Sequence, residues 1–244
     1  MAQPLWRTVK GGSRAYVDRI AALLGPRVRM GAGVARVVRG PYGVEVANTR
    51  GRVELFDQVV LACHSDQALR LLKDADAEER AVLGAVRYGP NRAYLHRDPR
   101  LMPKRRAAWG SWNALAAEGG AGTLTYWMNS LQTIDPKRPL FVSLNPDTPP
   151  DPALTFEVFD CDHPRFDTAA LAAQRRIGRI QGRGGVWYAG AWLGHGFHED
   201  GLTSGLRVGR ALGGAVAWDF VDHRIVGGPL PAPHVAAPSR RAAA

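Results

Sequence analysis

The stretch from Val186 to Leu212 limits the possible folds more than any other part of this chain. It opens with a short apolar run, passes through a glycine-rich stretch, and closes with apolar residues at helical spacing. Asp200 suits the N-cap of that helix, which would place the backbone N–H groups of Gly201 and Leu202 in its first turn. The pattern therefore predicts a strand, a loop and a helix whose positive end suits an anion or an electron-rich oxygen.

Glycine recurs every four residues along the predicted helix, at Gly201, Gly205, Gly209 and Gly213. This spacing puts the glycines on one helix face that has no side chains. Each interior glycine costs about 1 kcal/mol relative to alanine, so the repetition indicates that something approaches this face closely. Close packing of the helix on a sheet and a flat ligand ring explain the pattern equally well.

Bulk composition is that of an ordinary globular chain. Its 244 residues are 45% apolar, enough for one large domain or two small ones. No run approaches the roughly 20 apolar residues of a membrane-spanning helix, and the N-terminus does not resemble a secretory signal. The two cysteines, Cys63 and Cys161, provide no disulfide framework, and both are predicted to be buried thiols. These features favour a cytoplasmic location.

The chain is basic, with a formal net charge of +10. Such a charge attracts nucleic acid, anionic lipid or anionic substrates. Arginine is scattered, however, and only residues 104–106 form a cluster, without the interleaved aromatic residues of RNA-binding modules. We therefore expect no nucleic-acid binding, whereas peripheral contact with a membrane surface stays open.

The N-terminal third predicts a helix followed by strands. Ser13 suits an N-cap, apolar residues recur at helical spacing through 14–24, and Gly25-Pro26 stops the helix. A hairpin is expected over 34–46, then a strand over 56–62 and a short helix over 66–72. Gly31-Ala32-Gly33 begins a G-x-G-x-x-G pattern, but Arg36 takes its last position and β-branched residues follow, so we do not assign a dinucleotide fingerprint there.

Residues 85–160 predict a mixed β region. Aromatic and β-branched runs at 92–96, 107–113, 123–128, 140–144 and 154–159 alternate with Pro, Gly and Asp, as in an antiparallel sheet. Trp127 and, later in the chain, Trp192 are candidates for the wall of an apolar pocket, with core packing as the simpler alternative. A helix is expected over 167–181.

Three groups of residues carry a family resemblance. The motif Asp200-Gly201-x-x-Ser204-Gly205-x-x-x-Gly209, entered from a strand that ends in Ala189-Gly190, resembles the C-terminal flavin-binding motif of the flavin amine oxidase superfamily. Gly11-Gly12-Ser13 and the pattern of residues 34–62 are similar to earlier segments of that superfamily. The runs at 60–66, 126–129 and 196–201 look typical of a bacterial group of predicted NAD/FAD-binding proteins. The resemblance covers about residues 4–215.

The resemblance implies an α/β fold, a partial FAD-binding domain of the Rossmann-like amine oxidase type with an inserted mixed or antiparallel substrate sheet. Residues 4–80 and 165–222 would belong to the FAD-binding domain and 85–164 to the substrate domain, and 226–244 would be a disordered tail. The implied activity is hydride transfer from an apolar or amine small-molecule substrate to FAD. The implied cofactor-binding residues are Val34, Ala62, Gly190, Ala191, Asp200, Gly201 and Leu202.

Two departures from the family pattern weaken the implied cofactor site. Ala191 stands where many members place Glu or Asp, and the family's opening strand–G-x-G-x-x-G–helix is not in this sequence. We therefore expect the chain to bind FAD poorly alone and to require a missing N-terminal half as a partner. A cofactor-free remnant or partner-binding module and a basic lipid-associated protein are the alternatives.

The loop before the last helix is rich in polar residues. His195, His198, Glu199 and Asp200 are four potential metal ligands within six residues. A loop that faces flavin or substrate explains them better, so no metal is assigned. His198 is a weak candidate for a residue near the reacting centre, and no catalytic acid or base is named.

Overall fold

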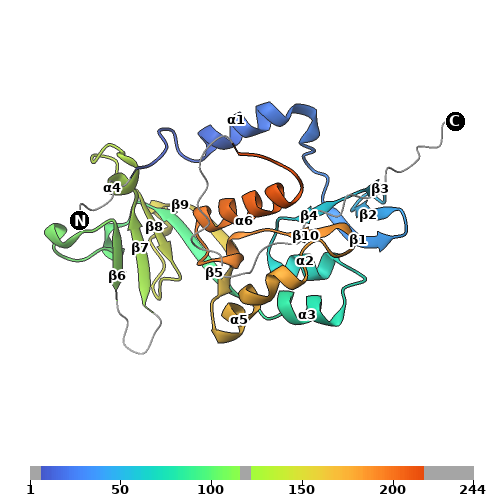
Figure 1. Cartoon of the computed structure of the whole chain (residues 1–244). Coiled ribbons are helices and arrows are strands. Elements are labelled where there is room, and N and C mark those ends of the chain that lie inside the picture. The colour runs from blue at the N-terminus through green and yellow to red at the C-terminus, as the bar shows by residue number, and fades with distance from the viewer. Residues whose placement is uncertain (1–6, 116–121, 217–244) are drawn as a thin grey trace, which may run out of the picture. The chain divides into compact units, whose positions relative to one another are not determined.

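Two compact units make up the chain (Figure 1). The computed structural model describes residues 7–115 and 122–216, so the predicted tail at 226–244 lies outside the described residues. Unit 1 comprises residues 1–29 and 90–163, and unit 2 comprises residues 30–89 and 164–244. Each unit is described separately below. The chain contains both helices and sheets, which confirms the predicted α/β class.

Unit 1 is built on a five-stranded sheet of order β6-β7-β8-β5-β9. The pairs β6–β7, β7–β8 and β8–β5 are antiparallel, as predicted. One predicted run was too long, because residues 106–108 form a 3₁₀ turn and the strand begins only at Trp112. The strands are β5 (Arg87–His96), β6 (Trp112–Leu115), β7 (Thr123–Trp127), β8 (Phe141–Leu144) and β9 (Thr155–Arg165).

The two faces of this sheet differ in chemistry. One face is apolar and none of its residues is buried, and we call it the Trp112 face. Paired positions place on it Trp112, Tyr126, Val142 and Leu95 in one row and Ala114, Leu124, Leu144 and Ala93 in the next. The opposite face holds buried polar side chains, because Asn113, Thr125 and Ser143 alternate with these apolar residues. The apolar face is thus the uncovered one.

His96 belongs to the polar face and is fully buried. Its Nδ1 accepts from the Asp98 N–H (3.1 Å), and its Nε2 lies 2.8 Å from Ser143 Oγ, which lies 2.6 Å from Thr125 Oγ1. Because Nδ1 is an acceptor, the neutral ring donates from Nε2 to Ser143. The Asp98 carboxylate instead binds Arg100. This arrangement excludes a Ser-His-Asp triad, in which Nδ1 must donate to the carboxylate and Nε2 must accept from serine.

We expect unit 1 to lose stability as the pH falls below neutrality. Burial lowers the pKa of His96 below its usual value of 6.5. The unfolded chain then binds more protons than the folded chain between that lowered pKa and about 6.5, so stability rises with pH through this window and is complete above it. Urea unfolding followed by tryptophan fluorescence on both sides of the window tests this. His96→Gln should flatten the dependence, and an unchanged slope in that variant would contradict the assignment.

Unit 2 combines an antiparallel sheet and a parallel strand pair. The predicted hairpin is confirmed as β1 (Val34–Gly40) and β2 (Gly43–Asn48), extended by β3 (Val53–Phe56). A strand rather than a helix follows Gly33, which confirms that Gly31-Ala32-Gly33 is not a dinucleotide fingerprint. The parallel pair joins β4 (Val59–Leu61) to β10 (Val186–Tyr188).

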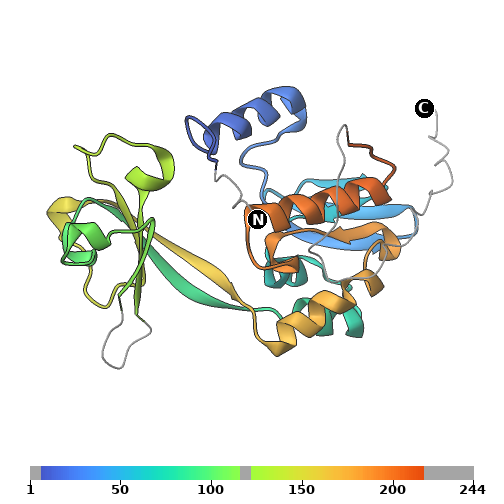
Figure 2. The same ribbon diagram turned by 60° about the vertical axis from the view of Figure 1, so that its left-hand side comes forward.

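Four helices cover the parallel pair. They are α2 (Ser65–Leu71), α3 (Ala77–Leu83), α5 (Thr168–Arg176) and α6 (His198–Ala211). Figures 1 and 2 show α6 on one side of β10 and β4 and the other three helices on the opposite side. Accordingly Tyr188 packs in the large core with α2, α3 and α5, whereas Trp187 packs with Val208 of α6.

The outer edge of β10 is closed by the chain itself. Ala189 N–H donates to Leu61 O on the β4 side, so the backbone groups of Tyr188 point the other way. There the Gln181 side chain bonds both of them, accepting from Tyr188 N (2.8 Å) and donating to Tyr188 O (2.7 Å). One carboxamide thus satisfies the backbone groups that a neighbouring strand would otherwise pair.

A buried carboxylate joins three elements of unit 2. Glu79 on α3 is 1% exposed, accepts from the Tyr188 hydroxyl (2.7 Å) and Asp76 N–H (2.9 Å), and is paired with Arg39 of β1. Arg39 also donates to Arg183 O (2.9 Å). Burial beside this carboxylate raises the pKa of Tyr188 far above its usual range. The hydroxyl therefore stays protonated and donates to Glu79.

Helix α1 (Arg14–Leu24) confirms the predicted boundaries and ends at Gly25, whose φ is +54°. None of its residues is buried. Among the described residues of both units, no helix is long and apolar enough to cross a bilayer.

Candidate functional site

The first turn of α6 is held by Asp200. Its Oδ2 accepts from the backbone N–H groups of His195 (3.0 Å) and Phe197 (2.9 Å), which fixes the loop that leads into the helix. The helix begins at His198 with Phe197 at the N-cap, so the prediction of Asp200 as N-cap was wrong. Gly194 leaves room for this carboxylate, because a Cβ there would lie 2.4 Å from the Asp200 carboxyl carbon.

The earlier helix start changes which backbone groups are free. Gly201 N–H already donates to Phe197 O (3.2 Å), inside the helix. A cofactor contact at Gly201 N–H would therefore compete with this hydrogen bond. The sequence pattern places Gly201 and Leu202 in the first turn because Asp is a commoner N-cap residue type than Phe.

Ser204 connects α6 to the end of β10. Its hydroxyl accepts from Gly190 N–H (2.9 Å) and donates to Gly201 O (2.8 Å). The backbone of Gly190 is thereby held beside the first turn of the helix. This is the physical role of the serine in the Asp-Gly-x-x-Ser-Gly motif, and motif spacing alone did not reveal it.

The glycine face of α6 is open in unit 2. A Cβ built at Gly205 or Gly209 would meet no other atom within 4 Å, and one at Gly201 would meet only Ala191, at 3.8 Å. The helix packs instead through Ser204 and Val208, which are buried. Close helix–sheet packing within unit 2 therefore does not explain Gly205 and Gly209, and this face is free of protein side chains there.

Most of the predicted cofactor-binding residues come together at this end of unit 2. Because β4 and β10 are parallel, Ala62 and Gly190 follow their strands at the same edge. Ala191 lies against Gly201, which brings α6 to that edge. Ala62 is exposed there. Val34 lies elsewhere, as the first residue of β1 in the antiparallel sheet, where it is partly exposed.

Both predicted tryptophans make contacts typical of a core. Trp192 is 3% exposed and its Nε1 donates to Cys63 O (3.2 Å). Trp127 in unit 1 contacts Trp109 edge-on (5.4 Å between centroids), and its Nε1 donates to Asn129 Oδ1 (3.1 Å). It lies opposite the Trp112 face. These contacts favour the core-packing alternative for each.

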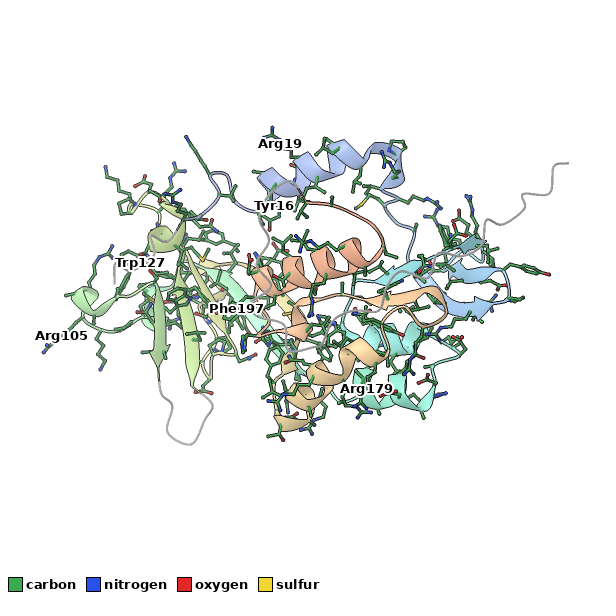
Figure 3. The ribbon with its side chains drawn as sticks, in the orientation of Figure 1. Tyr16, Arg19, Arg105, Trp127, Arg179 and Phe197 are labelled. Carbon is green, nitrogen blue, oxygen red and sulfur yellow. The ribbon has the colours of Figure 1, made fainter. Side chains whose placement is uncertain are left out.

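The polar loop residues are solvent-accessible. His195 and His198 are exposed, and so is the apolar Phe197 between them (Figure 3). In the described part of the chain, no group of three or more His, Cys, Asp or Glu side chains is arranged to hold a metal ion. The thiols are also less buried than predicted, because Cys63 is partly exposed and Cys161 is exposed.

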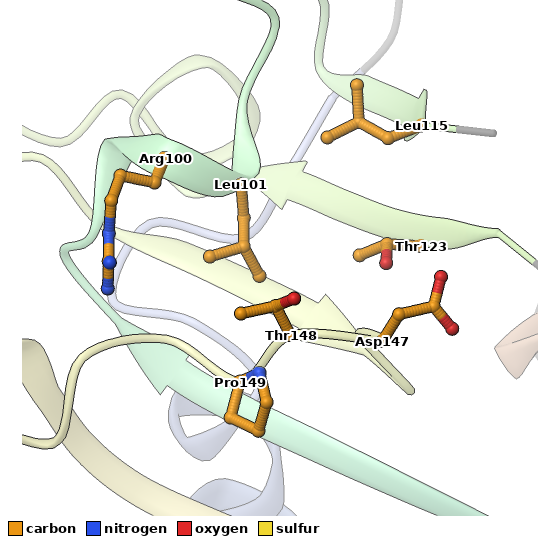
Figure 4. Close-up of a pocket in the computed structure, with 7 residues that line it drawn as sticks. All are labelled: Arg100, Leu101, Leu115, Thr123, Asp147, Thr148 and Pro149. Carbon is orange, nitrogen blue, oxygen red and sulfur yellow. The ribbon is translucent and has the colours of Figure 1, made fainter. Parts of the chain in front are cut away.

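Two pockets lie among the described residues of unit 1. The larger, about 740 Å³, is lined by Arg7 and Thr8, by Trp112, and by Met128 and neighbouring residues of α4 (Met128–Gln132). The smaller, about 290 Å³, is lined by Leu101, Leu115, Thr123 and Asp147 among others (Figure 4). Trp112 and Leu115 are three residues apart on β6 and point to opposite faces of the sheet. The larger pocket therefore adjoins the Trp112 face and the smaller one the polar face.

Sequence reasoning missed the Glu79 network and the glutamines that bind backbone. Gln174 donates to Trp192 O (2.9 Å) and Gly194 O (2.7 Å) and so supports the loop from behind. A signal for α3 was present, because Asp76-x-x-Glu79 has capping-box spacing and both reciprocal hydrogen bonds form.

The comparisons with known proteins agree with this geometry. A family model described as flavin containing amine oxidoreductase matches residues 1–144, more than half of the chain. No curated protein sequence matches. Among solved structures, putrescine oxidase bound to putrescine superposes with a TM-score of 0.56 and 14% identity over 83% of this chain. Cyclohexylamine oxidase from Brevibacterium oxydans IH-35A superposes with a TM-score of 0.58 and 16% identity over 82% of this chain. Reduced UDP-galactopyranose mutase superposes with a TM-score of 0.60 and 12% identity over 84% of this chain.

These structures establish the fold, since their sequence identities are too low to carry more. The chain spans about half of their length, namely 53% of the putrescine oxidase chain and 52% of each of the other two.

Proposed function

Because the chain belongs to the family of flavin containing amine oxidoreductases, we propose that it forms part of an FAD-dependent oxidoreductase. The observation that carries the proposal is the open glycine face of α6, which begins beside the carboxyl ends of β4 and β10. A flat ring system fits such a face because no side chain stands in its way. When bound there, FAD supplies the redox chemistry.

The residues of this chain would bind and position the cofactor. Ala62, Gly190 and Ala191 would approach it from the strand ends, and Ser204 keeps Gly190 in place. The positive end of α6 would stabilise negative charge on a reduced ring. The Asp200 carboxylate holds the loop at this helix end in one conformation. Since Ala191 provides no carboxylate, contact at that position would be through backbone only.

The substrate is proposed to be a small molecule with an apolar part. The Trp112 face offers eight apolar side chains that nothing in unit 1 buries, and the larger pocket adjoins it. Ser111, Ser130 and Arg7 add polar groups at that pocket. An amine with an aliphatic or ring body and an apolar chain with a polar end both satisfy this lining.

The alternative is a cofactor-free remnant or partner-binding module. The occupied N–H of Gly201 and the missing carboxylate at Ala191 favour weak FAD binding by the chain alone. The visible absorbance spectrum of the purified chain, after incubation with excess FAD and desalting, tests whether the chain holds the cofactor by itself. Retained flavin absorbance counts against the cofactor-free alternative. A colourless chain fits both the alternative and an enzyme part that binds FAD only together with a missing N-terminal half.

Gly205→Ala tests whether the glycine face holds the flavin. We expect this variant to raise the free energy of unfolding by about 0.5–1 kcal/mol, because alanine favours the helix and its Cβ meets nothing. FAD affinity, measured by quenching of flavin fluorescence, should fall at the same time. Val208→Ala is the matched control on the buried face, where stability should fall instead. A more stable variant with unchanged FAD affinity would place the cofactor elsewhere.

A further inference from the structure

Helix α1 carries an uncovered apolar stripe. Along it, five apolar side chains recur at helical spacing, and all are exposed: Tyr16, Val17, Ile20, Leu23 and Leu24. Figure 3 labels Tyr16 and Arg19, which are three residues apart and therefore neighbours on the helix, so that Arg19 borders the apolar stripe. Arg14 and Asp18 lie across the helix from the middle of the stripe. Leu23 is the extreme case, with 78% of its surface exposed.

An eleven-residue helix of this kind needs a surface to lie on. Isolated helices shorter than about 12–15 residues are marginal in water, and most helical stability in proteins comes from packing an apolar face. None of the residues of α1 is buried, and even Ala21 is only partly covered. Nothing in the described part of unit 1 covers the stripe, so it is available as a binding surface.

The charge around α1 selects an anionic partner. Residues 7–29 contain six arginine or lysine side chains and one acidic residue, Asp18, so this segment carries +5 of the chain's formal +10. Half of the net charge thus lies in 23 residues around one exposed amphipathic helix. Basic residues beside an apolar stripe are the pattern of helices that lie in the interface of an anionic membrane.

We propose that residues 7–29 dock the protein on anionic lipid surfaces, with the α1 stripe inserted into the interface and the basic residues on the headgroups. Arg7 and Thr8 also line the larger pocket of unit 1. Docking would therefore bring the mouth of this pocket close to the lipid surface. The proposal is independent of flavin binding, since no residue of the α6 site takes part.

Co-sedimentation of the full chain with vesicles tests the proposal. We expect binding to phosphatidylcholine vesicles that contain phosphatidylglycerol, little binding to pure phosphatidylcholine, and a steep loss of binding with added salt. Ile20→Glu should lower the partition coefficient about tenfold or more, because it puts a charge into the inserted stripe. Leu55→Glu is the matched control, since Leu55 on β3 is 55% exposed and Ile20 is 53% exposed.

The electrostatic part is tested separately. Arg14→Gln and Arg19→Gln should each weaken binding about fivefold at low salt, whereas Arg50→Gln in unit 2 should not. Far-UV circular dichroism checks that each variant folds. If Ile20→Glu does not fold, Leu23→Gln is used in its place. Equal binding to neutral vesicles, or equal binding by wild type and the α1 variants, overturns the proposal. The proposal is also overturned if the chain does not bind vesicles but self-associates through α1. Light scattering would show this as an oligomer of the wild type that Ile20→Glu dissociates.

Discussion

Replacing Glu79 with leucine is expected to lower the free energy of unfolding of unit 2 by about 3–5 kcal/mol. The carboxylate is 1% exposed and satisfies the Tyr188 hydroxyl, the Asp76 N–H and the Arg39 guanidinium together. Without it, the buried Tyr188 hydroxyl loses its partner and the mostly buried Arg39 guanidinium keeps only Asp74 as a charged partner, and such losses are costly for desolvated groups. Urea unfolding followed by far-UV circular dichroism and by tryptophan fluorescence measures the loss.

Two companion variants show whether burial is the cause. Glu78→Gln changes a neighbouring carboxylate that also binds arginines but is more exposed, with 26% of its side-chain surface accessible against 1% for Glu79, and it should have a smaller effect. Adding Arg39→Met to Glu79→Leu should restore part of the stability, because it removes a mostly buried cation that would keep only Asp74 as a charged partner. Equal losses for Glu79→Leu and Glu78→Gln would show that the network contributes no more than a surface ion pair.

Gly185→Ala is expected to cost about 3 kcal/mol, from two sources. Its φ is +81°, which a side chain tolerates poorly, and a Cβ there would lie 2.7 Å from the Asp57 backbone oxygen. The backbone of β10 starts at the next residue, so relief of this contact must move the strand away from β4. Thermal unfolding and urea unfolding both report the loss.

Gly51→Ala is the matched control for the backbone term. Gly51 has nearly the same φ, +82°, but a Cβ there meets nothing within 4 Å. The expected cost is about 1 kcal/mol from conformation alone. The difference between the two variants measures the close approach of Gly185 to Asp57, and equal costs would mean that this approach relaxes freely.

Local patterns predicted the elements well where the signal was strong. Ser13 and Gly25 bracket helix 14–24, and Gly40–Gly43 turns the hairpin, because glycine marks positions where the chain must change direction. Helix starts were less certain. Asp200 lies inside α6, and α2 begins at Ser65, one residue before the predicted start at Asp66. Several nearby polar residues can satisfy the same N–H groups, so the sequence does not fix which one precedes the helix.

The candidate site was predictable as a strand, loop and helix but not as a set of contacts. Ser204 binding Gly190 and Gln174 binding Gly194 depend on tertiary placement, which no spacing in the sequence encodes. The Glu79 network joins residues from three distant segments and was missed for the same reason. The open glycine face was one of two alternatives that sequence could not separate, because a glycine stripe looks the same whether a sheet or a ligand covers it.

The parallel pairing of β4 with β10 has a consequence for the order of folding. Val59 pairs with Val186, and the whole five-stranded sheet lies between them in the sequence. Hairpin pairs such as β6–β7 close short loops and form early, whereas β4 must wait for β10 to leave the ribosome. Until then the edge of β4 is unpaired. An unpaired strand edge favours aggregation, so we expect the growing chain to need chaperones at this stage.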